Sequence, residues 1–153
     1  MEFVRHRVMS FAQESTRYCN YSKDKFGNEL TFIKPCWLDI PTGQYVYWDS
    51  NWYDINKMKI KLPEGEHKDI DAFLWTLNNA ETHYTLLINS GWKPQEARAV
   101  LPNSLKTELV MTGFVSDWNH FFELRCDSAA HLQARELAIP LKEEFIKKGY
   151  ITE

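Results

Sequence analysis

The residues best suited to chemistry lie near the N-terminus, in the stretch RHRVMSFAQESTRY from Arg5 to Tyr18. This stretch places three arginines and a histidine close to several hydroxyl side chains. Guanidinium groups form planar, forked hydrogen bonds that match phosphates and carboxylates, and hydroxyls add further donors. The stretch lacks the glycines of a loop that grips phosphate through its backbone. We therefore interpret it as a side-chain site for a small anionic ligand.

A second interpretation of the same stretch needs no ligand. If residues 3–9 form a strand, Arg5 and Arg7 project from one face and His6 from the other. The two arginines would then lie on a solvated edge and pair with an acid such as Glu14. Composition alone leaves both interpretations open.

The whole-chain composition excludes several classes of protein. The chain has 153 residues, of which 44% are hydrophobic, and a formal net charge of −3. This length supports one core and predicts a single domain, and the acidic balance argues against a nucleic-acid-coating protein. No apolar run approaches the roughly 20 residues of a membrane span, and no signal-like start is present. We expect a cytoplasmic protein that binds neither membranes nor nucleic acid.

The cysteines do not indicate a metal or disulfide site. Cys19, Cys36 and Cys126 are odd in number and far apart, with no CxxC pair and no histidine at zinc-ligand spacing. We expect reduced thiols that pack as small hydrophobic side chains, and no metal.

Hydrophobic periodicity predicts the elements that must position the candidate residues. Strands are expected over residues 3–9, 30–38 and 105–112, and helices over 68–90, 94–100, 117–125 and 128–139, with Pro140 kinking or stopping the last helix. Residues 39–66 resist assignment and are expected to form a long excursion that packs aromatic side chains. The fold class predicted is α+β, with an antiparallel sheet flanked by helices.

Three ordered blocks of the sequence carry a resemblance to a known family. The first is Arg5-His6-Arg7 followed, after seven residues, by Ser15 within STRY; the others are EARAVLP at 96–102 and WNHFFELRCDSAAHLQAREL at 118–137. Together they resemble the flavin-dependent thymidylate synthases over nearly the whole chain. Only residues 1–4 precede the first block, whereas family members usually carry a long N-terminal part, so the resemblance implies an N-terminally short member or fragment.

The resemblance implies a reaction and its partners. Members of that family methylate dUMP to dTMP, with methylenetetrahydrofolate as carbon donor, reduced FAD as hydride donor and NADPH to recharge the flavin. They work without the cysteine nucleophile of the flavin-free enzymes. The resemblance also implies a homotetramer in which subunits share active sites, and we expect the helix over 68–90 to supply part of the interface.

The resemblance further assigns roles to individual residues. The FAD contacts that it implies are Arg5, His6, Arg7, Val8, Gln13 and His120, and the dUMP contacts are Gln13, Glu14, Ser15, Arg17, Arg98 and Arg125. Ser15, Arg17 and Arg98 are expected to hold the phosphate, the last from a neighbouring subunit. Arg125 is expected to meet the uracil carbonyl edge, where a fixed cation would favour the electron-rich ring needed for attack. It is the residue to which we assign the chemistry.

Some positions depart from the family pattern, and some roles have alternatives. Glu2 stands where a glutamine is usual, and Phe114 and Ser116 stand where Asn and Arg often help to bind FAD. Arg125 could instead cap a helix or pair with Asp127, and Ser15 could be a nucleophile, although no Ser-His-Asp order supports this. Two other functions remain open: a non-catalytic flavin- or nucleotide-binding remnant of the family, and a small nucleic-acid-binding module.

Overall fold

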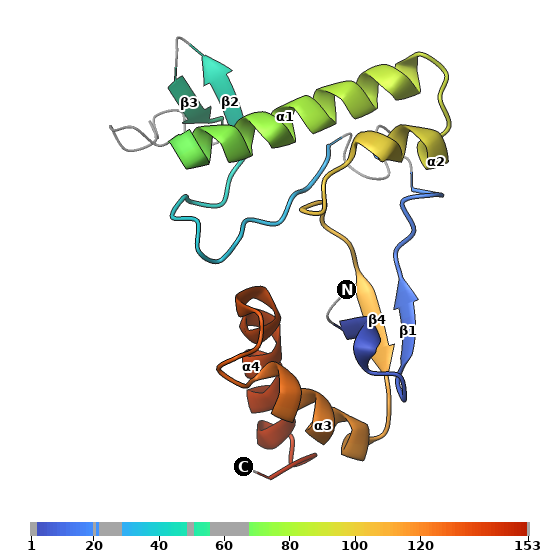
Figure 1. Cartoon of the computed structure of the whole chain (residues 1–153), viewed down its shortest axis with the longest axis vertical. Helices are drawn as coiled ribbons and strands as arrows, with labels where there is room; N and C mark the ends of the chain where they lie inside the picture. Colours follow the sequence, from blue (N-terminus) through green and yellow to red (C-terminus); the bar gives the residue numbers. More distant parts are fainter. Residues whose placement is uncertain (1–2, 20, 22–28, 49–50, 56–67, 153) are drawn as a thin grey trace. The chain divides into compact units, whose positions relative to one another are not determined.

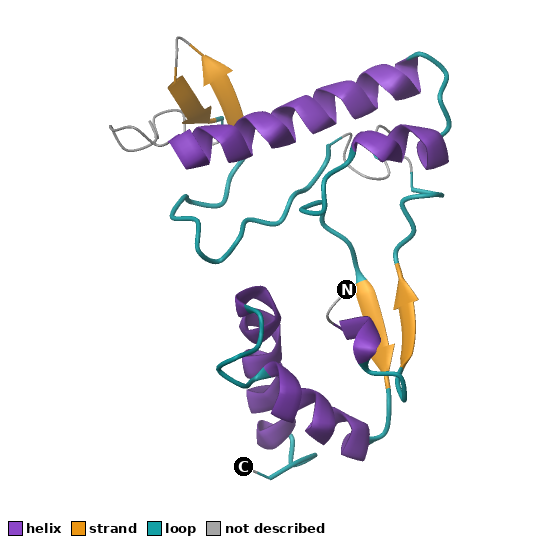
Figure 2. Cartoon of the chain, in the orientation of Figure 1, coloured by secondary structure: helices purple, strands orange, loops and turns teal. Residues whose placement is uncertain are grey.

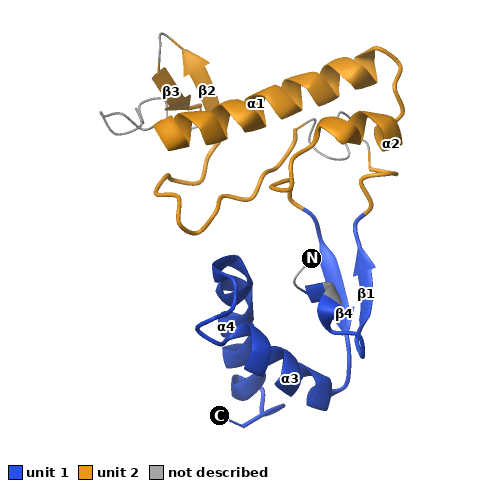
Figure 3. Ribbon diagram, in the orientation of Figure 1, with its two compact units in different colours: residues 1–14, 107–153 blue, residues 15–106 orange. Residues whose placement is uncertain are grey.

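The computed structural model describes residues 3–19, 21, 29–48, 51–55 and 68–152 (Figure 1). Its contacts group the chain into two compact units, one of residues 1–14 and 107–153 and the other of residues 15–106 (Figure 3). We call them unit 1 and unit 2 and describe each by itself; the single domain expected from the sequence stays a prediction. Two small antiparallel sheets and four helices give the α+β architecture that was predicted (Figure 2).

Unit 1 is built on a two-stranded ladder between segments far apart in the sequence. Strand β1 (Ser10–Gln13) pairs antiparallel with β4 (Leu109–Thr112), with Ser10 opposite Thr112 and Gln13 opposite Leu109. The short 3₁₀ helix η1 (Phe3–Arg5) precedes β1, and helices α3 (Val115–Arg125) and α4 (Leu132–Lys147) follow β4. The ladder therefore brings the RHR block and the C-terminal helices into one unit (Figure 1).

The core of unit 1 is mainly aromatic. Phe121 and Phe122 of α3 are buried together with Met9 and Ala138, and Trp118 and Phe145 pack against them. The Phe121 and Phe122 rings lie 5.5 Å apart at 79°, an edge-to-face arrangement that suits the charge distribution of aromatic rings. Burying each ring stabilises the fold by about 2 to 3 kcal/mol. This core fixes the face of α3 from which the last residue of the helix, Arg125, projects.

Unit 2 is organised by helix α1 (Lys68–Asn89), as the hydrophobic spacing predicted. The helix buries Ile70, Leu74, Ala80 and Tyr84 along one side, and Gly91 ends the segment with φ of 92°, a conformation open to glycine. Helix α2 (Pro94–Ala97) and the 3₁₀ helix η3 (Arg98–Val100) follow, which confirms the helix predicted over 94–100.

A β-hairpin occupies part of the segment that the sequence left unassigned. Strand β2 (Tyr45–Trp48) pairs antiparallel with β3 (Asn51–Asp54), and Trp52 is buried against Ile70 and Leu74 of α1. The rings of Tyr47, Trp52 and Trp75 meet at tilted or edge-to-face angles of 55–68°, with centroids 4.7–5.1 Å apart. The prediction that this segment packs aromatic side chains is confirmed for these residues, whereas residues 56–67 lie outside the described part.

Three predicted elements are wrong in kind or in extent. Residues 3–9 form η1 and a turn, because the N–H groups of His6 and Met9 donate to carbonyls three residues earlier. Residues 30–38 make only an isolated bridge, Phe32 to Leu105, and β4 begins at Leu109 instead of residue 105. These segments have strand-like composition, but no neighbouring strand among the described residues pairs with them along their length.

The last helix also differs from its prediction. The prediction was a helix over 128–139 that Pro140 kinks or stops, whereas α4 begins at Leu132 and runs through Pro140 to Lys147. His131 caps its N-terminus by accepting a hydrogen bond from the N–H of Gln133. Packing of Leu141 and Phe145 against the unit 1 core stabilises the turns beyond the proline. In the described part of the chain, no helix is both long and apolar enough to cross a membrane.

Candidate functional site

A buried hydrogen bond joins the RHR block to the end of α3 in unit 1. The Nε–H of Arg125 donates to Nε2 of His6 at 3.0 Å, and the two residues are 9% and 5% exposed. The backbone turn around η1 directs His6 inward, while α3 places Arg125 at its last residue. The structure therefore brings together a residue expected to bind flavin and the one expected to act on the uracil ring.

The chemistry of this hydrogen bond defines the state of His6. An arginine side chain is always a donor, so the Nε2 atom that accepts from it carries no proton and the ring is neutral, with its proton on Nδ1. Burial, aided by the positive charge of Arg125 and by His120, lowers the pKa of His6 below its ordinary value. The site thus combines one permanent cation with one neutral imidazole.

Aromatic rings enclose this pair on the side of α3. The His6 ring lies 4.9 Å from the Phe121 ring and 6.2 Å from the His120 ring, measured between centroids. Asp127, the alternative partner of Arg125, accepts a hydrogen bond through Oδ1 from the N–H of Ala129. Phe121 and Phe122, which precede Arg125 on α3, are buried, whereas Leu124 is exposed.

The two arginines of the RHR block point away from the buried pair. Arg5 and Arg7 are exposed, and neither side chain makes a hydrogen bond or ion pair with another described residue. Val8 follows them and is 72% exposed. The outward arginines and inward histidine keep the alternation expected of a strand, although a 3₁₀ turn produces it. Two neighbouring guanidinium groups of this kind complement a multiply charged anion.

The remaining unit 1 candidates lie on the ladder and on α3. Gln13 ends β1, is exposed and donates through Nε2 to Oγ1 of Thr107 at 3.4 Å. Glu14 continues the ladder through its backbone N–H, which donates to the carbonyl of Glu108. His120 is exposed on α3, with Nδ1 3.6 Å from a carboxylate oxygen of Glu123. The side chains of Gln13 and His120 are therefore accessible to a ligand, whereas Glu14 is partly buried.

The phosphate candidates gather in unit 2, and all three are exposed. The backbone N–H of Arg17 donates to Oγ of Ser15 at 3.3 Å, and the N–H groups of Tyr18 and Cys19 both donate to the Ser15 carbonyl. Arg98 begins η3 and donates to Oγ1 of Thr16 at 3.1 Å. A turn after β1 and a helix pair after α1 thus bring the STRY and EARAVLP blocks together within one chain.

Two residues that contact the phosphate candidates, Thr16 and Gln95, were not predicted as site residues. Arg17 donates through Nε to Oε1 of Gln95 at 3.3 Å, and Thr16 accepts from Arg98. Both are neutral groups that orient a guanidinium without cancelling its charge. Gln95 lies three residues before Arg98 in the sequence, and Thr16 lies between Ser15 and Arg17. Their closeness in sequence to predicted residues is the signal that could have identified them.

The cysteines match their expected role in two cases of three. Cys19 and Cys126 are partly buried and pack against the cores of their units, and burial raises the pKa of Cys126, which disfavours the thiolate. Cys36 is exposed, so the prediction that it packs as a core residue is wrong. Of the other histidines, His83 is exposed and His131 caps α4, whereas His67 lies outside the described residues.

Comparison with known proteins gives a consistent family. Residues 1–148 match the family described as thymidylate synthase complementing protein. A flavin-dependent thymidylate synthase of Mycobacterium sp. (strain KMS) is 42% identical over 153 residues, which cover 95% of this chain and 52% of the relative. The enzyme of the same name from Pyrococcus furiosus is 29% identical over 153 residues, covering 98% of this chain and 50% of the relative.

The match extends across the sequence blocks and both compact units. The chain therefore belongs to the thymidylate synthase complementing protein family, and both of these relatives are flavin-dependent thymidylate synthases. The chain spans about half the length of the curated relatives that it matches.

Proposed function

We propose that this chain carries the dUMP-side and flavin-side residues of a flavin-dependent thymidylate synthase, which methylates dUMP to dTMP with methylenetetrahydrofolate as carbon donor. The observation that carries the proposal is the buried hydrogen bond between Arg125 and His6, in a chain that matches the family over residues 1–148. This bond joins the first and third of the sequence blocks that suggested the family.

Unit 2 supplies the phosphate-binding part of the proposal. Arg17 and Arg98 are exposed, positively charged and oriented by the neutral partners Gln95 and Thr16. With the hydroxyl of Ser15, Arg17 forms a donor set suited to a phosphate dianion. We expect Gln13 and Glu14 to contact the nucleotide. We propose that Arg98 reaches the phosphate held by a neighbouring subunit, so that each site combines Ser15 and Arg17 of one chain with Arg98 of another.

Unit 1 supplies residues that fit a flavin. The guanidinium groups of Arg5 and Arg7 have no hydrogen-bond or ion-pair partner among the described residues, and their charge and geometry suit a pyrophosphate. Val8, Gln13 and His120 would provide further contacts to the flavin. When bound, the reduced flavin would supply the hydride. His6 is buried, and its hydrogen bond to Arg125 adds a positioning role to the cofactor contact expected of it.

The proposed chemical role of Arg125 follows from its burial. A guanidinium in a partly dry site stabilises negative charge developing on an oxygen more strongly than it would in water. Held by His6, Arg125 would polarise the uracil carbonyl edge and favour the electron-rich ring that attacks the methylene carbon. No cysteine is needed for this activation, and the raised pKa of Cys126 is consistent with a packing role.

The partners expected from the family complete the proposal. NADPH would recharge the flavin, and a homotetramer would assemble active sites from several subunits, with α1 as part of the interface. Trp75 and Leu86 of α1 are 38% and 59% exposed, which leaves apolar surface on the helix.

Light scattering tests the oligomeric state. A stable monomer that still binds dUMP tightly would contradict shared sites. The expectation of a cytoplasmic location stays a prediction.

The decisive experiment uses flavin absorbance. The purified chain is expected to bind FAD, and its reduced flavin is expected to be oxidised in a single turnover when dUMP and methylenetetrahydrofolate are both added. Oxidation that is independent of dUMP would contradict the proposal. A yellow protein without dUMP-dependent oxidation would instead support the alternative of a non-catalytic flavin- or nucleotide-binding remnant.

A further inference from the structure

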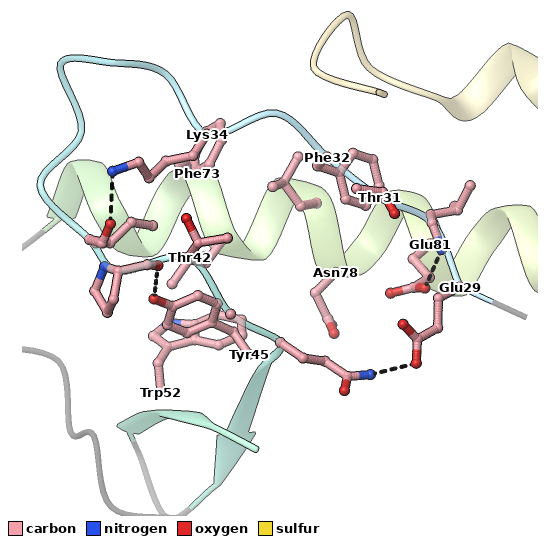
Figure 4. A pocket seen from close by; sticks show the side chains of 17 residues that line it. Glu29, Thr31, Phe32, Lys34, Thr42, Tyr45, Trp52, Phe73, Asn78 and Glu81 are labelled. Carbon is pink, nitrogen blue, oxygen red and sulfur yellow. Dashed lines mark hydrogen bonds between the residues drawn. The ribbon is translucent and has the colours of Figure 1, made fainter. Parts of the chain in front are cut away.

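A cavity in unit 2 lies apart from every residue assigned above. It has a volume of about 370 Å³ and lies between α1, the β2–β3 hairpin and the segment 29–44 (Figure 4). Its described lining belongs entirely to unit 2 and includes none of the proposed nucleotide or flavin contacts. The volume is within the range typical of small-molecule sites.

The floor of the cavity is apolar and aromatic. Ile40, Trp52 and Leu74 line it and are all buried, with Trp52 only 3% exposed. Tyr45 and Phe73 are partly buried and pack against the same core. A planar ring would bury apolar surface here and meet the faces or edges of other rings.

One end of the cavity is polar and acidic. Glu29 and Glu81 lie there together, and Asn78 reaches from α1 into the space between these carboxylates and the Tyr45 and Trp52 rings (Figure 4). Each glutamate has one oxygen in a hydrogen bond, since Glu81 accepts from the N–H of Leu30 at 3.0 Å and Glu29 from Gln44 at 3.0 Å. The second oxygen of each carboxylate has no hydrogen-bond donor among the described residues.

The walls are held in place by hydrogen bonds within the lining. Besides the two glutamate bonds, Lys34 donates through Nζ to the Ile40 carbonyl at 3.0 Å, and the Tyr45 hydroxyl donates to the Pro41 carbonyl. These bonds tie the segment 29–44 to itself and to α1. A ligand would therefore meet a largely preformed surface, which lowers the entropy lost on binding.

The charge around the cavity is negative at the polar end. Lys34 is the cation among the described lining residues, and it lies at the end opposite Glu29 and Glu81 (Figure 4). Burial raises the pKa of the Tyr45 phenol, and Asp54, the buried last residue of β3, raises it further through its negative charge. The potential at the polar end favours a cation.

We propose that this cavity is a binding site for a small planar aromatic cation, whose ring rests on the Trp52 floor and whose amino or amidine group meets Glu29 and Glu81. The aromatic floor and the acidic end select the two halves of such a molecule. An amidine presents paired N–H donors, which match a carboxylate in the same forked manner as a guanidinium. The site is independent of the proposed thymidylate chemistry.

The test compares benzamidine with its neutral isostere benzamide on the unaltered chain, without dUMP or flavin. The chain has six tryptophans, so the indole N–H region of a ¹H–¹⁵N spectrum is simple, and the Trp52→Phe spectrum identifies the Trp52 signal. Benzamidine is expected to shift this signal to saturation. Benzamide is expected to bind about tenfold more weakly, because it lacks the charge-assisted pair.

A pair of variants then tests whether the carboxylate of Glu81 contacts the amidine. Glu81→Gln keeps an oxygen that accepts from the Leu30 N–H, and it is expected to weaken benzamidine binding about tenfold. Glu143→Gln makes the same charge change at an exposed position of α4 in unit 1 and is expected to leave binding unchanged. Absence of saturable binding, equal affinity for benzamide, or equal affinity of the two variants for benzamidine would each overturn the proposal.

Discussion

The two units hold their candidate site arginines in opposite environments. Arg125 in unit 1 is 9% exposed and donates to the buried His6, whereas Arg17 and Arg98 in unit 2 are exposed and donate to neutral polar side chains. A buried guanidinium has lost water that only fixed partners replace, so its position is tightly determined. An exposed guanidinium keeps much of its hydration and adjusts to a ligand.

Under the proposed function, this difference would separate two kinds of work, the stabilisation of developing charge and the anchoring of a phosphate. A cation that acts on developing charge needs a low-dielectric surrounding and a fixed direction, and unit 1 provides both for Arg125. Cations that anchor a phosphate need reach and accessibility, and unit 2 provides these for Arg17 and Arg98. The four predictions below test this division.

The largest effect is expected on stability when His6 is removed. His6→Leu deletes the acceptor for the Nε–H of buried Arg125 and is expected to lower the free energy of unfolding by about 2 to 3 kcal/mol. His6→Gln places an acceptor near the position of Nε2 and is expected to recover most of this loss. His120→Leu is the matched control because His120 is exposed, with an expected change of about 0.5 kcal/mol or less. Urea denaturation measures all three, and equal losses for the two leucine variants would contradict the buried pair.

In unit 2 the effect is expected on binding and not on stability. Arg17→Ala should weaken dUMP binding by about 1.5 kcal/mol, the low end for a charge-assisted hydrogen bond, because the guanidinium is exposed. Unfolding and FAD binding should stay nearly unchanged. Lys148→Ala, an exposed charge deletion in unit 1, provides the control. Calorimetric titration with dUMP decides, and a parallel loss of FAD affinity would show that Arg17 is not a separate phosphate anchor.

Arg125→Lys tests the chemical role directly. Lysine keeps the charge but loses the planar fork, so dUMP-dependent flavin oxidation should slow about tenfold, or roughly 1.4 kcal/mol of barrier, with a smaller loss in dUMP affinity. Arg135→Lys on α4 makes the same exchange at a residue to which no ligand contact is assigned. Single-turnover oxidation of the reduced flavin is the measurement. The parental rate in the Arg125 variant would remove this residue from the mechanism.

The smallest effect is expected from pH. Burial, Arg125 and His120 lower the pKa of His6 below 6.5, so the unfolded chain takes up its proton at a higher pH than the folded chain does. The stability that neutral His6 contributes is therefore complete above about pH 6.5 and is lost as the pH falls towards the folded-state pKa. The stability difference between the parental chain and His6→Gln should shrink over this interval in pH-dependent denaturation. A constant difference would mean that His6 does not titrate as a buried neutral imidazole.

The helices were predictable because their periodicity extends over several turns. Helix α1 repeats apolar residues from Ile70 to Tyr84 and ends near glycine, so local pattern and tertiary burial agree. The strands were less predictable, since a strand of four residues such as β1 depends on a partner almost a hundred residues away. Residues 30–38 show the limit of composition, because β-branched and aromatic residues without a continuous neighbouring strand form only a bridge.

The sequence by itself determined the family, the candidate residues and their chemical types, because ordered motifs and fixed side-chain chemistry are local properties of the chain. Tertiary structure alone decided that His6 faces Arg125 while Arg5 and Arg7 face outward, since a 3₁₀ turn and the aromatic core around Phe121 set these directions. It also decided that Glu29 and Glu81 share one cavity with Trp52. Burial and proximity arise from contacts between distant segments, and these contacts convert residue types into a fixed cation, a neutral imidazole and an acidic pocket.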